Sequence, residues 1–466
     1  MTSEAGANGG SRNWSRRTFL GHGAKAAAAA AWAKTAIPRV HAAEDNTIRL
    51  ALIGCGGRGT GAVANAMTVP QGNVKLVAMA DVFPDRIKAA HKNLAQEFAA
   101  MVDVPPDRQF VGFDAYRKAI DCLRPGDVAL LTTHSAFRPL HLEYAVQKGV
   151  HVFMEKSFAP DPVGIRRIIR AGEAAEKKNL KIAAGLMCRH SPARQALIRK
   201  IRDGAMGQIQ LIRAYRMDAG GGLAPRKSNE SELLWQIRRA PWFFWGSSGR
   251  FIGLMVHQID ECCWIKDAWP VSAHGVGGRV ANSSDCSENL DSYSIEYTFP
   301  DGTKAMVVGR YIPNCHNEFA TFAHGAKCAA QFSGDIHAPT VRTYKDQRIA
   351  KDNIDWDYGY QAGRAWSTRY RGAESPWQEE WNVLLAAIRN DRPHNEAKRA
   401  AYADLAAIMG RAAVHSGKII TWEEAMQSNF QFCPYIDTLD ENSPPPVKPD
   451  AQGRYAPPVP GLWTEI

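Results

Sequence analysis

Short apolar runs alternate with helix-like segments through the first part of the chain after residue 47. The runs cover residues 48–53, 74–80, 110–113, 127–133, 150–154 and 181–186. The run at 127–133 is unbroken, as a strand buried on both faces requires. Helix-like segments lie at 84–100, 115–123, 137–148 and 162–179, and Gly149 is placed to cap the third of them. This alternation predicts a parallel sheet with right-handed crossovers.

The rhythm changes past about Ser191. Alternating apolar and polar positions at 208–217, 271–280, 291–299 and 304–312 predict half-buried strands, and a Pro-Asp-Gly-Thr turn at 300–303 joins the last two as a hairpin. Helical patterns cover 191–203, 253–265, 377–390 and 397–416, whereas 218–250 is irregular and rich in Gly, Trp and Phe. We expect an open, mostly antiparallel sheet, followed by a proline-rich tail from Ser443 that forms an irregular surface segment.

A glycine-rich stretch follows the first apolar run. Residues 54–59 read G-C-G-G-R-G, a G-x-G-x-x-G loop that leads into a small-residue helix. The first glycine allows a tight turn, the second lets the backbone approach a pyrophosphate, and the third lets helix pack closely on strand. The diphosphate would sit against N–H groups at the helix N-terminus. The loop alone is a weak signal.

The second apolar run strengthens it, because this run ends in Asp81, about where an acid that binds a ribose 2′-hydroxyl is expected. An αβ turn with an N-capping Asp is the competing interpretation. We predict an α/β protein with an N-terminal Rossmann dinucleotide-binding domain and a C-terminal α+β domain, since 466 residues exceed one compact core. The predicted boundaries are 1–43 for a leader and linker, 44–188, 189–430 and, for the tail, 431–466.

Charge changes this picture little. The formal net charge is +10, and half of it lies in the first 43 residues, which carry six Lys or Arg and one Glu. No Lys/Arg cluster interleaved with aromatic residues indicates a nucleic-acid partner. After the N-terminal region, no stretch is apolar for long enough to span a bilayer.

The nine cysteines are odd in number, none forms a C-x-x-C pair, and two are adjacent at 262 and 263. Neither a disulfide framework nor a zinc site is indicated, and we predict no metal. Thiols of this kind are normally kept in a reducing compartment.

The N-terminus resembles a twin-arginine export signal. Residues 15–20 read S-R-R-T-F-L and precede a weakly apolar, alanine-rich segment at 24–36, with small-residue cleavage sites at 31–33 and 40–42. A disordered basic tail is the alternative. The twin-arginine translocation machinery exports folded proteins, often with cofactor bound, so the thiols would be buried before they meet an oxidant. We therefore predict a periplasmic or otherwise exported protein.

From about residue 47 to 427 the chain resembles the Gfo/Idh/MocA family of sugar and polyol oxidoreductases. Besides the glycine loop, the motifs are A-D-V at 80–82, L-T-T at 131–133 with His141, G-V-H-V-F-M-E-K at 149–156, G-A-M-G-Q-I at 204–209 and V-H-Q-I-D at 256–260. The region 409–422 resembles exported members from Planctomycetes-like bacteria. The resemblance implies a Rossmann domain, then a domain whose sheet covers the nicotinamide and often mediates dimer or tetramer formation.

The resemblance also implies functional residues. The lysine of the family's Glu-Lys-Pro motif, which reaches the substrate hydroxyl, matches Lys156, although Ser157 replaces the proline and leaves φ less fixed. The catalytic histidine matches His257. Many members carry an Asp one turn earlier, where this chain has Gly253, and Asp260 lies at i+3. The expected cofactor-binding residues are Gly54, Gly56, Gly57, Arg58, Gly59, Asp81, Thr132, Thr133, His141, Glu155 and Lys156.

Oxidation of a secondary alcohol moves a hydride to the nicotinamide while a base takes the hydroxyl proton. An imidazole at His257 titrates near neutral pH and suits the base, and Lys156 would stabilise the developing alkoxide, unless burial lowers its pKa and the two roles exchange. A structural histidine and a solvated Glu-Lys strand end are the competing interpretations. Asp81 favours NAD by repelling a 2′-phosphate, while Arg58 leaves NADP open.

Weaker signals concern the substrate. Trp235, in the aromatic stretch, would stack on a pyranose ring, or would pack beneath a loop or at a subunit interface. Arg189 and His190 resemble a polar pair at the substrate cleft in relatives, or a plain turn, and Asp260 is a further candidate.

Three functions remain open. The first is an exported NAD-dependent dehydrogenase of a sugar, sugar acid or cyclitol, with a tightly held cofactor recycled by two substrates. The second is a redox-neutral glycoside hydrolase or lyase that uses bound NAD transiently. The third is a cofactor-binding protein without catalysis.

Overall fold

Six parallel strands form the first sheet, in the order β3-β2-β1-β4-β5-β6. The computed structural model describes residues 46–70, 72–227, 229–279, 284–334, 340–361 and 375–466, so the predicted export signal lies outside the described residues. The strands are β1 (Ile48–Ile53), β2 (Val74–Asp81), β3 (Gln109–Val111), β4 (Val128–Leu131), β5 (His151–Met154) and β6 (Ile182–Ala184). The order reverses between β1 and β4, the kind of switch point at which α/β sheets bind ligands.

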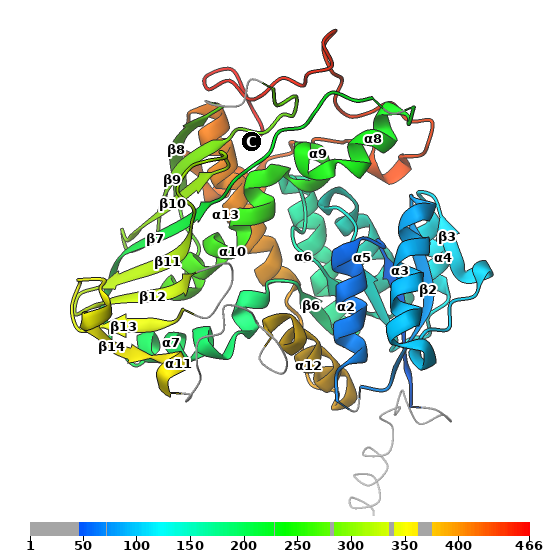
Figure 1. The fold of residues 1–466 in the computed structure, drawn as a ribbon, viewed down its shortest axis with the longest axis horizontal. Helices are drawn as coiled ribbons and strands as arrows, with labels where there is room; N and C mark the ends of the chain where they lie inside the picture. The colour runs from blue at the N-terminus through cyan, green and yellow to red at the C-terminus, as the bar shows by residue number, and fades with distance from the viewer. Residues whose placement is uncertain (1–45, 71, 228, 280–283, 335–339, 362–374) are drawn as a thin grey trace, which may run out of the picture. The chain divides into compact units, whose positions relative to one another are not determined.

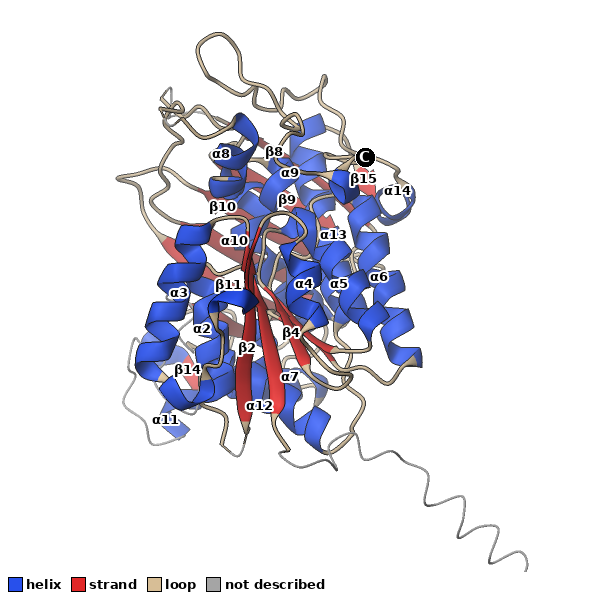
Figure 2. Ribbon diagram, turned by 90° about the vertical axis from the view of Figure 1, so that its right-hand side faces the viewer, coloured by secondary structure: helices blue, strands red, loops and turns tan. Residues whose placement is uncertain are grey.

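Helices cover both faces of this sheet (Figure 2). On one face lie α2 (Gly57–Met67) and α3 (Pro84–Glu97), and on the other α4 (Ala115–Asp121), α5 (Arg138–Lys148) and α6 (Pro162–Lys177). Leu50 and Leu52 of β1 pack toward the first pair, while Ala51 and Ile53 pack toward the second group. The unbroken apolar runs in the sequence follow from this two-sided burial.

Local signals set the helix ends. Helix α5 ends at Gly149 in the left-handed conformation, with φ of 74°, which confirms the predicted cap. Helix α6 begins after Asp161, whose side chain accepts a hydrogen bond from the Gly164 N–H at 2.9 Å, and Pro162 occupies its first position.

In the part of the chain that the structure describes, the second sheet has nine strands in the order β14-β13-β12-β11-β7-β10-β9-β8-β15. Only the β7–β10 pair is parallel among the described pairings, which confirms the expected mostly antiparallel sheet. The strands are β7 (Ile209–Met217), β8 (Ser272–Gly278), β9 (Ser292–Thr298), β10 (Lys304–Arg310), β11 (Glu318–Gly325), β12 (Ala329–Gly334), β13 (Arg342–Tyr344), β14 (Ile354–Asp357) and β15 (Ile420–Thr421).

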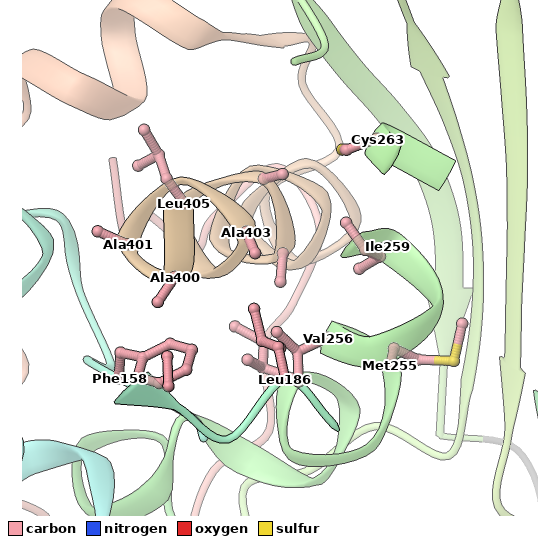
Figure 3. Close-up of a cluster of buried hydrophobic side chains, with 14 of the residues drawn as sticks. Phe158, Leu186, Met255, Val256, Ile259, Cys263, Ala400, Ala401, Ala403 and Leu405 are labelled. Atoms are coloured by element: carbon pink, nitrogen blue, oxygen red, sulfur yellow. The ribbon is translucent and has the colours of Figure 1, made fainter. Parts of the chain in front are cut away.

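Two long helices, α10 (Gly249–Lys266) and α13 (Ala397–Ser416), lie between the two sheets (Figure 1). Figure 3 shows how closely they join the two parts of the molecule. Phe158, from the parallel-sheet region, lies next to Ala400 of α13, and Leu186 lies beside Val256 of α10 in the same buried cluster. The small alanine side chains of α13 let this helix pack closely against its neighbours. The two sheets are therefore joined through one continuous core.

The remaining helices are shorter. They are α7 (Pro192–Arg202), α8 (Glu232–Arg238), α9 (Phe244–Ser247), α11 (Tyr358–Gln361), α12 (Pro376–Arg389) and α14 (Trp422–Gln427). The stretch 218–250, expected to be irregular, therefore contains two short helices. Among the described helices, none combines the length and the apolar composition that a membrane crossing needs. Residues 47–466 form one compact unit, so the boundary placed at 188/189 stays a prediction.

The proline-rich tail is irregular but is not simply a surface segment, which corrects the sequence-based expectation. Tyr455 and Glu465 are buried. Glu465 accepts hydrogen bonds from Arg411 Nε at 2.8 Å and pairs with His415 Nδ1 at 3.1 Å, both on α13. Proline content excludes regular helix and sheet but does not say which side chains are buried.

Candidate active site

A cavity of about 820 Å³ opens at the carboxyl edge of the parallel sheet. Its walls come from the glycine loop, the ends of β2, β4 and β5, and, across the cavity, β7, α10 and α12. The size lies within the range of small-molecule and cofactor sites. Both sheets therefore contribute to one site.

The glycine loop lines this cavity, and its glycines are required for different reasons. Gly54 has φ of +99°, and a Cβ there would lie 2.6 Å from the Thr133 nitrogen. A Cβ at Gly59 would lie 2.3 Å from the Gly54 oxygen and 2.5 Å from Thr132 Oγ1, so only glycine lets α2 pack this closely. A Cβ at Gly56 or Gly57 would meet nothing within 4 Å. This open space beside a helix N-terminus fits a diphosphate.

Asp81 lies at the end of β2 and lines the cavity. Its carboxylate accepts backbone hydrogen bonds from Cys55 at 2.7 Å and Phe83 at 3.0 Å, which fix its orientation. Each oxygen keeps a second lone pair for a ligand hydroxyl. Burial raises the pKa of Asp81, and the two backbone N–H groups oppose that shift.

The end of β4 supplies polar groups to the same wall. Thr132 Oγ1 donates to the Gly54 carbonyl oxygen at 2.6 Å, and Thr133 Oγ1 lies 3.2 Å from His141 Nδ1. The His141 ring stacks on Tyr116, with ring centroids 4.2 Å apart. Burial lowers the pKa of His141 to about 3, so this ring is neutral at physiological pH.

An ion pair joins the glycine loop to the end of β5. Arg58 Nε lies 2.5 Å from Glu155 Oε1, and both residues line the cavity. Glu380 of α12 is buried nearby, and no described group hydrogen-bonds to either of its oxygens. Burial and the charge of Glu155 raise the pKa of Glu380 well above its ordinary value.

Lys156 follows Glu155 and crosses to the second part of the molecule. Its Nζ donates a hydrogen bond to the Gly253 carbonyl oxygen of α10 at 2.5 Å. Burial lowers the pKa of Lys156, while Glu155 raises it. The Lys156–Ser157 peptide bond is cis.

Asp404 of α13 holds the backbone after Lys156. One carboxylate oxygen accepts hydrogen bonds from the N–H groups of Phe158 and of Ala159, the latter at 3.1 Å. Burial raises the pKa of Asp404 to about 7, although the two N–H groups and Lys156 lower it. A buried carboxyl from another element thus supports the segment in which the family motif has proline.

His257 lies one helical turn after Gly253 on α10 and lines the cavity. Lys156 Nζ contacts the backbone one helical turn before His257, and both residues line the cavity. The start of α10 is fixed by Arg411, which donates to the carbonyl oxygens of Ser248 at 3.0 Å and Pro160 at 2.9 Å.

The structure therefore brings together the twelve residues expected to be catalytic or cofactor-binding. These are Gly54, Gly56, Gly57, Arg58, Gly59, Asp81, Thr132, Thr133, His141, Glu155, Lys156 and His257.

The four expected substrate residues do not line the cavity. Arg189 donates two hydrogen bonds to Asp260, from Nε to Oδ2 at 2.8 Å and from Nη2 to Oδ1 at 2.7 Å. Both side chains are thus paired with each other outside the cavity. His190 Nε2 lies 3.4 Å from Glu396 Oε1. Trp235 packs in an aromatic cluster with Phe243 and Tyr455. This arrangement agrees with the packing alternative for the aromatic stretch rather than with stacking on a sugar ring.

Further residues that line the cavity were not predicted from the sequence, among them Asp85, Arg86, Tyr116, His134, Arg216 and Trp377. Asp85 and Arg86 lie in the first turn of α3, four and five residues after Asp81, so their nearness in sequence to the predicted ribose-binding acid was a usable signal. Arg216 and Trp377 come from β7 and the start of α12, and they reach the cavity only through the tertiary fold.

No family model matches the chain. The chain is 23% identical over 234 residues to the rhizopine catabolism protein MocA of Rhizobium meliloti, a match covering 49% of this chain and 68% of that protein. It is 29% identical over 180 residues to inositol 2-dehydrogenase of Klebsiella pneumoniae, covering 38% of this chain and 48% of the enzyme. This second match spans about half of the relative.

The fold matches solved structures. Scyllo-inositol dehydrogenase from Lactobacillus casei, solved with NAD(H) and scyllo-inositol, superposes with a TM-score of 0.59 at 20% identity, covering 81% of this chain and 99% of that enzyme. The chain thus has the α/β fold of this dehydrogenase, and the sequence matches support the resemblance to the Gfo/Idh/MocA family.

Proposed function

We propose that the chain is an NAD-dependent oxidoreductase that transfers a hydride between a secondary alcohol of a sugar, sugar acid or cyclitol and a nicotinamide cofactor. The observation that carries the proposal is the contact between Lys156 Nζ and Gly253, one turn from His257, in the cavity that the glycine loop lines. The similarity to an inositol 2-dehydrogenase and to the fold of an NAD(H)-bound scyllo-inositol dehydrogenase supports it.

The residues present fit a dinucleotide. The open space at Gly56 and Gly57 would take the diphosphate, and the Asp81 carboxylate would accept a ribose hydroxyl and repel a 2′-phosphate. The Arg58 guanidinium pairs with Glu155 at the end of β5 and not with Asp81. It is therefore not held at the predicted ribose site, where it would bind the 2′-phosphate of NADP, and this further supports NAD. When bound, the nicotinamide supplies the hydride acceptor.

The protein supplies acid–base chemistry and charge. His257 takes the proton of the substrate hydroxyl as the hydride leaves carbon. The Lys156 ammonium hydrogen-bonds the same oxygen and stabilises the negative charge that develops there. Because burial lowers the pKa of Lys156, its neutral amine forms more readily than in water, and that amine can take the hydroxyl proton in place of His257, so that the two roles exchange.

The cofactor is held tightly in this proposal. Ile237 and Pro241, from the stretch 218–250, line the cavity, and Trp235, Trp245 and Tyr455 form a buried cluster in the same part of the fold. A cofactor covered by such a layer would leave slowly. A second substrate would then return the bound cofactor to its starting redox state.

Purified full-length protein tests the proposal. We expect mass spectrometry of the denatured protein to show co-purified NAD, and we expect cyclitols or sugar acids to change its nicotinamide absorbance in single turnover. Release of sugar from a glycoside without net absorbance change would indicate a redox-neutral hydrolase instead. Absence of both dinucleotide binding and any turnover would overturn the proposal.

We also propose that residues 1–43 direct export through the twin-arginine pathway and that the mature protein is a homodimer or homotetramer. The paired arginines at 16 and 17 support the first proposal. A reporter fused after residue 43 should reach the periplasm, and Arg16→Lys with Arg17→Lys should retain it in the cytoplasm. Light scattering of the purified protein should give two or four subunits, and a monomer would contradict the second.

A further inference from the structure

A second cation lines the cavity near Lys156. Arg216, at the end of β7, lines the wall that also contains Gly253 and His257, and its side chain is 15% exposed. It lies close enough to the Lys156 ammonium to help lower the pKa of that group. The second sheet therefore brings a guanidinium to the place where the substrate would bind.

Neighbouring residues hold this guanidinium in place. Arg216 Nε lies 3.3 Å from Asp218 Oδ2, and the guanidinium carbon is 4.5 Å from the ring centroid of Phe319, its partner on β11. Arg250 Nη2 lies 3.5 Å from the other oxygen of Asp218. One carboxylate is thus shared by two guanidinium groups, and positive charge remains.

The acids that line the cavity do not cancel this charge. Among the described lining residues the acids are Asp81, Asp85 and Glu155. The first two lie at β2 and α3, beside the predicted ribose site, and Glu155 is already paired with Arg58 at 2.5 Å. The end of the cavity beside Lys156 and Arg216 is therefore electropositive.

Arg216 also has an unused donor. Its Nη1 is buried, and none of the described groups accepts a hydrogen bond from it. A buried charged donor without a partner costs free energy, and native proteins rarely keep one without a reason. An acceptor on a bound ligand would satisfy it.

Building on the proposed function, we propose that Arg216 determines specificity by binding a carboxylate of the substrate, so that the preferred substrates are sugar acids rather than neutral sugars or cyclitols. Guanidinium and carboxylate form charge-assisted hydrogen bonds in a shared plane, which fixes orientation as well as charge. Lys156 would then hold the reacting oxygen while Arg216 holds the acid group of the same molecule.

The test compares substrate pairs that differ only in the acid group, such as a uronic acid and its parent aldose, with a sugar phosphate as a third arm. For the wild-type chain we expect kcat/KM to favour the uronic acid by about 10- to 100-fold, the value of a charge-assisted hydrogen bond. Arg216→Gln should abolish most of this preference, mainly by raising KM for the uronic acid rather than by lowering kcat. Arg216→Lys should restore part of it.

Arg213→Gln is the matched control. Arg213 lies on the same strand, donates to His324 Nε2 at 3.1 Å and to the Tyr215 hydroxyl at 2.9 Å, and does not line the cavity. This variant should keep the wild-type preference. Thermal unfolding of all variants shows whether a loss reflects misfolding.

Each result decides the matter. Turnover of neutral substrates with no preference for acids, or a preference that survives Arg216→Gln, would overturn this inference and leave the proposed function standing. A higher kcat/KM for the sugar phosphate than for the uronic acid would overturn the carboxylate assignment and indicate that Arg216 binds a phosphate group. If no substrate is turned over, calorimetry with the uronic acid still decides, since binding should require Arg216 and not Arg213.

Discussion

The Lys156 ammonium and the Gly253 carbonyl oxygen are joined by a hydrogen bond of 2.5 Å that connects the parallel-sheet region to α10. A Cβ at Gly253 would meet nothing within 4 Å, so the helix leaves open space beside the ammonium. The bond sets Lys156 beside the helix turn that carries His257. The chemistry proposed for the site depends on this arrangement.

His257→Gln should lower kcat by about 10²- to 10⁴-fold, because the variant removes the side chain that we propose as the base for the hydroxyl proton. NAD affinity, measured by calorimetry, should change little. His274→Gln, at an exposed position on β8, is the matched control and should behave as wild type. An unchanged pH–rate profile in His257→Gln would show that another group is the base.

Gly56→Ala and Gly59→Ala should fail in different ways. The Gly59 Cβ would collide with Gly54 and Thr132, so we expect a loss of about 1–3 kcal/mol in the free energy of unfolding. The Gly56 Cβ meets only open space, so this variant should keep its stability but bind NAD more weakly. Chemical denaturation and calorimetry measure the two effects. Wild-type NAD affinity in Gly56→Ala would argue against a diphosphate at this turn.

Asp404 makes stability depend on pH. Its pKa is about 7 in the folded protein and near 4 in an unfolded chain. Because the folded value is the higher one, protonated Asp404 favours folding at low pH, and this contribution is lost as pH rises from about 4 to about 7.

Asp404→Asn removes this titration. We expect the stability of the variant relative to wild type to increase across the interval, by up to about 4 kcal/mol. Denaturant unfolding at several pH values measures the difference. Asp203→Asn, at the exposed C-terminal cap of α7, is the control. Parallel pH curves for Asp404→Asn and wild type would contradict the prediction.

Glu465→Ala should destabilise the protein by about 3–5 kcal/mol, because it leaves the buried Arg411 guanidinium without its counter-ion. The loss should also reduce turnover, since Arg411 binds the carbonyl oxygens of Ser248 and Pro160 beside the site. Leu462→Ala, 83% exposed in the same tail, should change neither quantity. Equal stability of the two variants would show that the tail contributes little.

The features predicted correctly depend on short stretches of sequence. The tight glycine turn, the strand that ends at Asp81 and the Gly149 cap each follow from backbone requirements that a few neighbouring residues determine. The alternation of apolar runs also predicted the parallel sheet, because two-sided burial leaves a strong signal.

The errors concern distant partners. Arg189 and Asp260 are 71 positions apart, and their pairing, which keeps both out of the cavity, is invisible in sequence. Arg216 was missed for the same reason, since only the packing of β7 against α10 brings it to Lys156. Strands β11 to β14 also escaped, and two of them are only three and four residues long.

The burial of Glu465 has a consequence for synthesis. The helix that carries His257 and the segment after Lys156 are both held by Arg411, which needs the Glu465 carboxylate. A nascent chain still on the ribosome lacks that carboxylate until residue 465 has emerged. The arrangement of the candidate active site is therefore completed only after residue 465 has been translated, and termination before that codon would leave it unfinished.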